Sequence, residues 1–378
     1  MSLSKSKSNA NANHSSVAAA PKPAISPSSI ENDAAQNLQS SMEDSAPSNK
    51  LDFVHDAVLL EETVAAVLGV KSLPKQKDGD QNGLNISGIY VDATFGRGGH
   101  SRLLLSQLAD DATLIVFDKD PTAISVAQEL ASKDSRVPVV HDSFATLTDS
   151  LAAMGISEVD GLMADLGISS PQIDDGSRGF SFMRDGAVDM RMDTSRGQSV
   201  AEWLEQVDDE TLANVLYEFG EERHSRRIAR AIKQMESYES TLELAEVIKE
   251  AHPNWQRGKH PATQSFQAMR IFINNELGDV DEFLAQSIAI LKSGGQLAVI
   301  SFHSLEDRRI KEFLQRHSKG QYPEDENLPM PPNRPRYFSK PKRVVPSKAE
   351  TSQNPRARSA WLRMATRTDT EYQQTAAP

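Results

Sequence analysis

Between residues 88 and 169, short apolar runs alternate with segments in which apolar residues recur every three or four positions. The apolar runs fit buried strands and lie at 88–95, 112–120, 137–144 and 159–169. The segments with helical spacing lie at 100–109, 121–132 and 146–155. Strands that alternate with helices at this spacing predict right-handed βαβ units and a parallel sheet.

The alternation stops after residue 170. Residues 170–198 are rich in Gly, Asp and Met and have no periodicity. Several helical patterns follow, the last at 279–295, before an apolar run at 296–304 returns to a strand. This order predicts an inserted helical domain at 170–272, so the α/β domain is discontinuous and comprises 51–169 and 273–378.

Residues 1–50 are rich in Ser, Ala, Asn and Pro. They cannot bury enough apolar surface to fold, so we expect a disordered tail. The chain has no cysteine, which excludes disulfides, thiolate zinc sites and cysteine nucleophiles and fits a cytoplasmic protein. No apolar run reaches the roughly 18 residues of a membrane span, and no apolar signal sequence is present, so we expect no membrane contact.

The net charge of −12 argues against nucleic acid as a partner, but positive charge is concentrated locally. Residues 331–363 hold nine Lys or Arg and one acid. Within them, 333–348 is basic and Pro-rich with Tyr337 and Phe338 between the charges, which makes it a candidate RNA contact. A solvated basic tail fits the charge equally well.

A second basic face is predicted on the helix at 221–235, where arginines recur at spacings of three and four: Arg223, Arg226, Arg227 and Arg230. Phosphate contact is one interpretation of this face. Pairing with the neighbouring acids Glu221 and Glu222 is the other.

Candidate chemistry stands where the predicted strands end. The first strand runs into the glycine-rich turn of VDATFGRGGHS, which lets a ligand approach the backbone and lacks the spacing of a P-loop or of G-x-G-x-x-G. Asp118 ends the second strand, where a carboxylate can accept both hydroxyls of an adenosine ribose. Asp120 is better placed to cap the following helix.

Phe144 ends the third predicted strand and fits either stacking on an adenine or a place in the core. Asp165 ends the fourth strand at the switch point where open α/β sheets bind ligands. A buried acid needs partners, and a sulfonium cation and a base amino group would supply them. Together these positions favour an adenosine-containing cofactor and leave NAD and S-adenosylmethionine (SAM) open.

Longer stretches resemble the ribosomal RNA small-subunit methyltransferase H family. They include GIYVDATFGRGGHSRLLLSQL, ADLGISSPQIDDGSRGFSFMRDGAVDMRMD, FGEERHSRRIARAI, HPATQSFQAMRIFINNEL and ISFHSLEDRRIK, and the resemblance runs from about 53 to 367. The resemblance implies a Rossmann-like, class I SAM-dependent methyltransferase with an inserted all-helical domain. It also implies N4-methylation of a cytidine in the decoding centre of 16S rRNA in the small ribosomal subunit, and it allows a homodimer.

Residue roles follow from the resemblance by position. Gly98, Gly99 and His100 would touch the methionine part of SAM, Asp118 the ribose, and Phe144 the adenine. The pocket near the reacting end would be completed by Asp165 and Gln172. Departures are small: Ala187-Val188 stands where proline-leucine is common, and Ala93 where glycine is frequent.

Methyl transfer from a sulfonium is an in-line displacement that needs alignment and no metal. A hydrogen-bond acceptor would activate the conjugated cytosine amine, and Asp165 is the candidate; contact with SAM alone is the alternative. The loop at 178–193 is expected beside the reacting site to seat the nucleotide, unless its aromatics pack the helical domain. Its candidate residues are Arg178, Phe180, Phe182, Arg184 and Arg191.

Two histidines complete the candidates. Neither His260 nor His303 has companion residues at the spacing of metal ligands. Structural roles are therefore predicted for both.

Overall fold

The structure is a computed structural model that describes residues 57–74, 83–253, 260–320, 322, 325, 327–330 and 332–372. The predicted tail at 1–50 lies outside these residues. Residues 54–378 form one compact unit. No helix among the described residues is long and apolar enough to cross a membrane.

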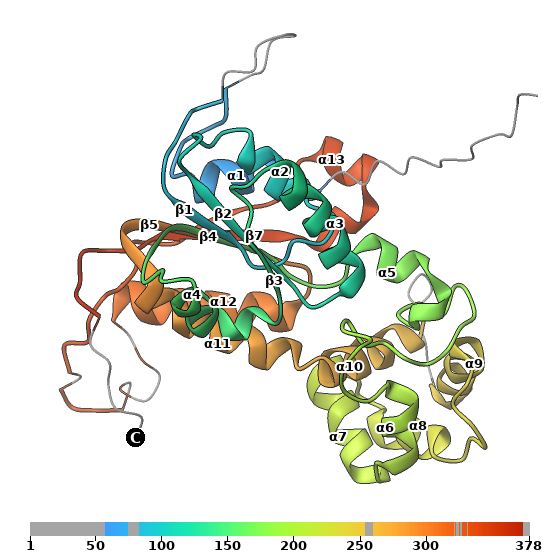
Figure 1. The fold of residues 1–378 in the computed structure, drawn as a ribbon. Coiled ribbons are helices and arrows are strands. Elements are labelled where there is room, and N and C mark those ends of the chain that lie inside the picture. Colours follow the sequence, from blue (N-terminus) through green and yellow to red (C-terminus); the bar gives the residue numbers. More distant parts are fainter. Residues whose placement is uncertain are drawn as a thin grey trace, which may run out of the picture. The chain divides into compact units, whose positions relative to one another are not determined.

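A seven-stranded sheet forms the centre of this unit, with the order β3-β2-β1-β4-β5-β7-β6 (Figure 1). Strands β1 to β5 are parallel, whereas β7 is antiparallel to both β5 and β6. The strands are β1 (Ile89–Asp92), β2 (Thr113–Asp118), β3 (Val139–His141), β4 (Val159–Asp165), β5 (Leu291–Ser301), β6 (Lys342–Val344) and β7 (Trp361–Thr366). This is a Rossmann-like order with one strand inserted antiparallel near the edge, so the predicted α/β fold and parallel sheet are confirmed.

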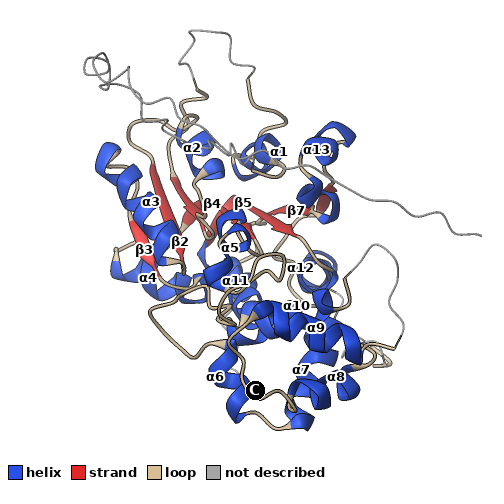
Figure 2. Ribbon diagram, turned by 90° about the vertical axis from the view of Figure 1, so that its right-hand side faces the viewer, coloured by secondary structure: helices blue, strands red, loops and turns tan. Residues whose placement is uncertain are grey.

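Helices cover both faces of the sheet (Figures 1 and 2). One apolar core lies beneath α1 (Leu60–Val67), α2 (Gly99–Leu105) and α3 (Pro121–Lys133). The other lies beneath α4 (Leu147–Ala153), α11 (Glu276–Ile290) and α12 (Ser304–Lys319). The central strands are buried on both faces, which explains their nearly continuous apolar sequences. Two short elements precede β7: α13 (Lys348–Gln353) and η4 (Pro355–Ser359).

The helices between β4 and α11 have a third core of their own, which contains Trp203, Leu216, Ile228 and Met269. These elements are α5 (Ser170–Asp174), η2 (Gly176–Arg178), α6 (Val200–Gln206), α7 (Asp209–Gly220), α8 (Ser225–Ile232), α9 (Thr241–Ala251) and α10 (Ala262–Ile273). The Ser199 hydroxyl and the Glu202 carboxylate form a capping box that begins α6.

The predicted helix at 279–295 is wrong at its end, because α11 stops at Ile290 and Leu291 begins β5. Hydrogen bonds to the antiparallel neighbour hold this segment extended: Gly294 N donates to Arg367 O at 2.9 Å, and Arg367 N donates to Gly295 O at 2.8 Å. Strands β6 and β7 were not predicted, since their pairing is antiparallel and outside the βα alternation.

Candidate active site

The carboxyl ends of three adjacent parallel strands bring acidic side chains to one edge of the sheet. Asp92 ends β1 and lies in register with Val116 of β2 and Met163 of β4. Asp118 and Asp165 end those two neighbouring strands. Both carboxyls therefore lie on the same rim, which is the condition on which the predicted cofactor site depends.

Asp118 is held by the glycine-rich turn. Its Oδ2 accepts a hydrogen bond from Gly96 N at 2.7 Å, and its Oδ1 accepts one from Asp120 N at 2.8 Å. Each carboxylate oxygen has two lone pairs, so each can accept one further donor. Gly96 has a φ of 54°, and a Cβ placed there would meet nothing within 4 Å. Open space therefore lies beside the turn that holds Asp118.

Gly98 and Gly99 begin α2 and are required by packing. Gly98 has a φ of 74°, and a Cβ there would come within 2.5 Å of the Phe95 ring. A Cβ on Gly99 would lie 3.0 Å from the Ala57 side chain. These two glycines shape the turn, whereas Gly96 is the position at which a ligand has room to approach the backbone.

His100 places an imidazole beside Asp165. Its Nε2 donates to Val58 O at 3.1 Å, and burial lowers its pKa to about 4, so the ring is neutral at pH 7. Nδ1 then carries no proton and lies 3.7 Å from Asp165 Oδ2, beyond hydrogen-bond distance.

Asp165 is the least satisfied carboxyl of the rim. Its Oδ1 is buried and has no hydrogen-bond partner among the described residues. Burial raises the pKa of Asp165 well above its usual range, and the charges of Asp92 and Glu306 raise it further. Burial also raises the pKa of Asp92 to about 6, although Ser101 Oγ donates to it at 2.6 Å. A buried acid without a partner costs free energy, so this geometry suits a ligand that supplies a cation or a donor.

The side-chain amide of Gln172, in α5, is held by two hydrogen bonds, one of them to Asp120 just after β2. Its Oε1 accepts from Ser169 N, and its Nε2 donates to Asp120 Oδ2, both at 2.8 Å. Asp120 also accepts from Thr122 N at 2.9 Å and from Arg178 Nη1 at 2.8 Å, and its predicted role as a helix cap is confirmed. Gln172 therefore joins α5 to the rim, while its predicted contact with a cofactor stays a prediction.

Phe144 lies in η1 (Phe144–Thr146), directly after β3. Its half-buried ring meets Phe283 of α11 edge-on, with centroids 5.3 Å apart. Part of the ring thus packs against the core, and the exposed remainder is what an adenine would contact.

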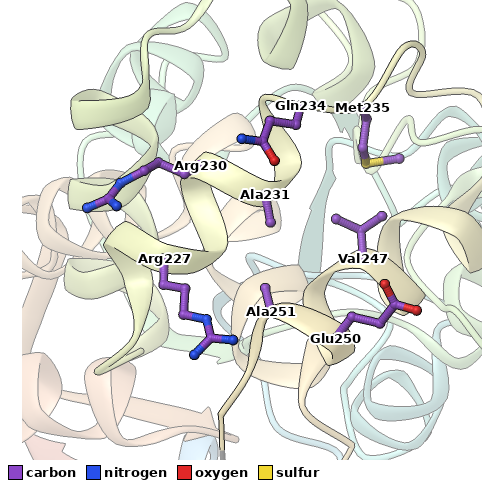
Figure 3. A pocket seen from close by; sticks show the side chains of 8 residues that line it. All are labelled: Arg227, Arg230, Ala231, Gln234, Met235, Val247, Glu250 and Ala251. Atoms are coloured by element: carbon purple, nitrogen blue, oxygen red, sulfur yellow. The ribbon is translucent and has the colours of Figure 1, made fainter.

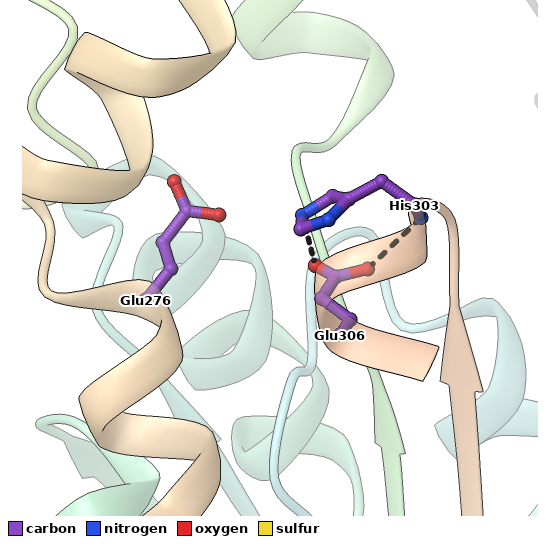
Figure 4. A group of neighbouring side chains, drawn as sticks. All are labelled: Glu276, His303 and Glu306. Atoms are coloured by element: carbon purple, nitrogen blue, oxygen red, sulfur yellow. Dashed lines mark hydrogen bonds and ion pairs between the residues drawn. The ribbon is translucent and has the colours of Figure 1, made fainter. Parts of the chain in front are cut away.

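A cluster of three ionisable side chains forms at the carboxyl end of β5: Glu276, His303 and Glu306 (Figure 4). One ligand atom from each lies within 4.8 Å of the other two. His303 Nε2 is 3.1 Å from Glu306 Oε1, while both oxygens of Glu276 accept from Arg270 at 2.7 Å. Sequence spacing missed this cluster because two helices, α11 and α12, assemble it. A metal ion would have to displace Arg270, so we interpret it as an ion network.

The aromatic residues of the loop at 178–193 pack the helical core. Phe180 is buried there, and the Phe182 ring meets Phe266 with centroids 4.9 Å apart. Packing, the alternative interpretation of this loop, therefore applies to both. His260 contacts Phe182 and accepts from Ala262 N at 3.2 Å, as expected of a structural histidine.

The arginines of the same loop make internal contacts. Arg178 pairs with Asp120, Arg191 pairs with Asp189 at 2.8 Å, and Arg184 donates to Asp174 O. These guanidinium groups therefore stabilise the loop, and their expected use in seating a nucleotide gains no support from the geometry.

The aromatic part of the predicted RNA contact at 333–348 is wrong. Tyr337 and Phe338 are 5% and 1% exposed and belong to the core beneath α11 and α12. They cannot stack on bases, because the apolar core needs them. Lys342 and Arg343 of the same stretch lie in β6, at the edge of the sheet.

Comparison with known proteins identifies the family. The model of the MraW methylase family matches residues 52–368. The chain belongs to this family. A protein of Psychrobacter cryohalolentis named ribosomal RNA small subunit methyltransferase H is 87% identical over 336 residues, which cover 89% of this chain and 98% of that protein. A protein of the same name from Acinetobacter baylyi is 52% identical over 315 residues, which cover 83% of this chain and 99% of that protein.

Membership in the MraW methylase family confirms the resemblance drawn from the sequence. The chain is a methyltransferase, and S-adenosylmethionine is its methyl donor. The alternative of a nicotinamide-dependent enzyme is thereby excluded. An unpartnered Asp165 and the open space at Gly96 fit this cofactor, which combines a cationic sulfonium with a ribose.

Proposed function

We propose that the chain methylates the N4 amino group of a cytidine in the decoding centre of 16S ribosomal RNA. The relatives are named for methylation of small-subunit ribosomal RNA, which supports the substrate class. The observation that carries the chemistry is the buried Oδ1 of Asp165, which has no partner among the described residues. An enzyme with this substrate works where ribosomal subunits are, in the cytoplasm.

Two carboxyls of the rim have separate roles in this proposal. When bound, S-adenosylmethionine supplies an electrophilic methyl group on a positively charged sulfur. Asp118 holds the ribose hydroxyls with the lone pairs that Gly96 and Asp120 leave available. Asp165, whose side chain is 28% exposed, accepts a hydrogen bond from the target amine and so draws the nitrogen toward a reactive geometry. Positive charge beside Asp165 favours its ionised form, the form that accepts.

His100 acts as a positioning residue. Because its bond to Val58 O fixes the ring, its unprotonated Nδ1 presents no donor to Asp165 and leaves the carboxylate available to a ligand. Gly98 and Gly99 support the turn at the methionine end, and Phe144 and Gln172 border the adenine and the reacting end.

The division of the chain belongs to the same proposal. The separate core of α6 to α10 supports a helical substrate-recognition domain at 170–272, with the methyltransferase domain at 51–169 and 273–378. A homodimer stays a prediction that sedimentation of the purified protein tests.

Methyl transfer into ribosomal subunits tests the function. Small subunits from a strain that lacks the enzyme are incubated with the protein and radiolabelled S-adenosylmethionine, and the digested RNA is analysed for N4-methylcytidine. Label in one cytidine of the decoding centre is expected. Label in another nucleoside overturns the assignment of the base, and absence of label from the RNA overturns the substrate.

A further inference from the structure

Helix α8 carries arginines that no acid neutralises. Arg226, Arg227 and Arg230 fall within about 100° of the helix circumference, and Arg223 precedes the helix by two residues. All four are exposed. Among the described residues, none of their guanidinium groups forms an ion pair or a hydrogen bond. In a chain of net charge −12, these arginines form a local concentration of positive charge.

The two acids that the sequence offered as partners point elsewhere. Glu221 pairs with Arg308 of α12 at 3.3 Å. Glu222 is buried, accepts from His224 N at 2.8 Å and lies 3.7 Å from His252 Nε2. Local neutralisation of the arginines, the alternative to phosphate contact, is therefore wrong.

A groove of about 590 Å³ adjoins this basic face, between α8 and α9. Ala231, Met235, Val247 and Ala251 give it an apolar floor. Its rim is polar: Figure 3 shows the guanidinium groups of Arg227 and Arg230 on the α8 side and the carboxylate of Glu250 on α9. The volume lies in the range of small-molecule sites.

We propose that α8 and this groove bind a single-stranded segment of the RNA substrate, with phosphates against the arginines and one unstacked base in the groove. Guanidinium groups match phosphate oxygens in charge and geometry. Sequence-specific RNA readers take up splayed bases, and the apolar floor suits the base plane. The Glu250 carboxylate is placed to accept from an exocyclic amino group. This inference rests on the proposed function and adds a second RNA contact outside the sheet edge.

The double variant Arg227→Gln/Arg230→Gln tests the phosphate contacts. With small subunits as substrate, we expect KM for the subunit to rise at least about tenfold, with kcat and the Kd for S-adenosylmethionine unchanged. Binding to deproteinised 16S RNA should lose salt dependence, with the slope of log K against log salt falling by about 1.4 for two lost contacts at roughly 0.7 each.

A matched double variant controls for net charge. Lys71 and Lys133 are exposed and lie outside the segment 170–272, so Lys71→Gln/Lys133→Gln removes the same charge without touching α8. Its KM for the subunit should equal that of the wild type. Ala231→Phe then tests the groove, because it fills the floor and keeps every arginine. We expect this variant to raise KM for the subunit with an unchanged melting temperature.

The outcomes separate this proposal from the proposed function. If the wild type labels RNA and the arginine variant keeps a normal KM and salt slope, the α8 surface is wrong and the function stands. A defect with whole subunits that vanishes with deproteinised RNA means that α8 contacts a ribosomal protein, which also overturns the proposal. A normal KM for Ala231→Phe overturns the base-binding groove. A wild type that labels no RNA overturns the function itself.

Discussion

The sheet edge and helix α8 place charged side chains in opposite environments, one buried and one exposed to water. At the sheet edge, Asp92, Asp118 and Asp165 are carboxyls whose pKa values burial raises. On α8, Arg227 and Arg230 are exposed to water, so their charge costs little to maintain. The two proposals use this difference: the sheet edge would receive a small cation taken out of water, and α8 a polyanion that keeps most of its hydration.

Asp120 shows that burial alone does not leave an acid unsatisfied. It is 4% exposed, against 28% for the side chain of Asp165, yet it has three donors, from Thr122 N, Gln172 Nε2 and Arg178 Nη1. Asp165 ends β4, and its Oδ1 accepts a hydrogen bond from no donor among the described residues. The protein therefore can satisfy a carboxyl at this edge, and the missing partner of Asp165 is consistent with the ligand contact that we propose for it.

Among the predicted effects, the largest is the loss of kcat in Asp165→Asn. The amide keeps the shape of the side chain but is a poorer acceptor, so kcat should fall at least about 100-fold. We expect the Kd for S-adenosylmethionine to change less than about tenfold, as measured by calorimetry. If the Kd weakens in parallel and kcat at saturating cofactor stays normal, Asp165 contacts only the cofactor.

Asp118→Ala should weaken the binding of S-adenosylmethionine. Two hydrogen bonds to a charged acceptor contribute about 1.5–3 kcal/mol each, so losing part of that raises the Kd for S-adenosylmethionine about 10- to 100-fold. Asp149→Ala, an exposed acid of α4, is the matched control and should bind normally. An unchanged Kd for Asp118→Ala would remove ribose recognition from this residue.

Cofactor affinity should depend on pH. Burial raises the pKa values of Asp92 and Asp118 to about 6, so both gain protons as pH falls through that value. A cation and two hydroxyl donors prefer the ionised carboxylates, so the Kd should fall as pH rises from 5 to 7 and by up to about tenfold per unit for each coupled proton. Calorimetry near pH 6 in buffers of different ionisation enthalpy should show proton release on binding. Proton uptake would contradict the assignment.

The same shifts set the stability of the protein without its ligand. A folded-state pKa above the unfolded value means that the folded chain binds the extra proton, so this contribution is present below about pH 4 and is lost as pH rises through 6. Asp165→Asn removes one such group. Its melting temperature should therefore exceed that of the wild type at pH 8, with the difference shrinking at acidic pH.

The strands and their terminal acids could be predicted because they are local signals. Asp118 and Asp165 directly follow apolar runs, and parallel strands place their carboxyl ends on one edge whatever the rest of the chain does. Asp120 was separable from Asp118 for the same reason, since Pro121 marks a helix start. These inferences needed no knowledge of distant contacts.

The remaining features depend on contacts between distant segments. Tyr337 and Phe338 stand among basic residues, and only the pairing of β7 with β5 shows that they belong to a core. Likewise, Glu221 is adjacent to the α8 arginines in sequence, yet it forms its ion pair with Arg308 of α12. Composition cannot distinguish a free cation from a paired one when the partner is 87 residues away.

The smallest effect is expected at the Glu276–His303–Glu306 cluster, where ions are already paired. Added zinc should leave the melting temperature of the wild type unchanged, because Arg270 holds both oxygens of Glu276. Arg270→Ala frees those oxygens and offers zinc two carboxylates and an imidazole, so zinc should then raise the melting temperature. Adding His303→Ala should abolish that rise. A zinc-dependent rise in the wild type would mean that the metal displaces Arg270 and that the cluster is a metal centre, which would place a third kind of charge beside Asp165.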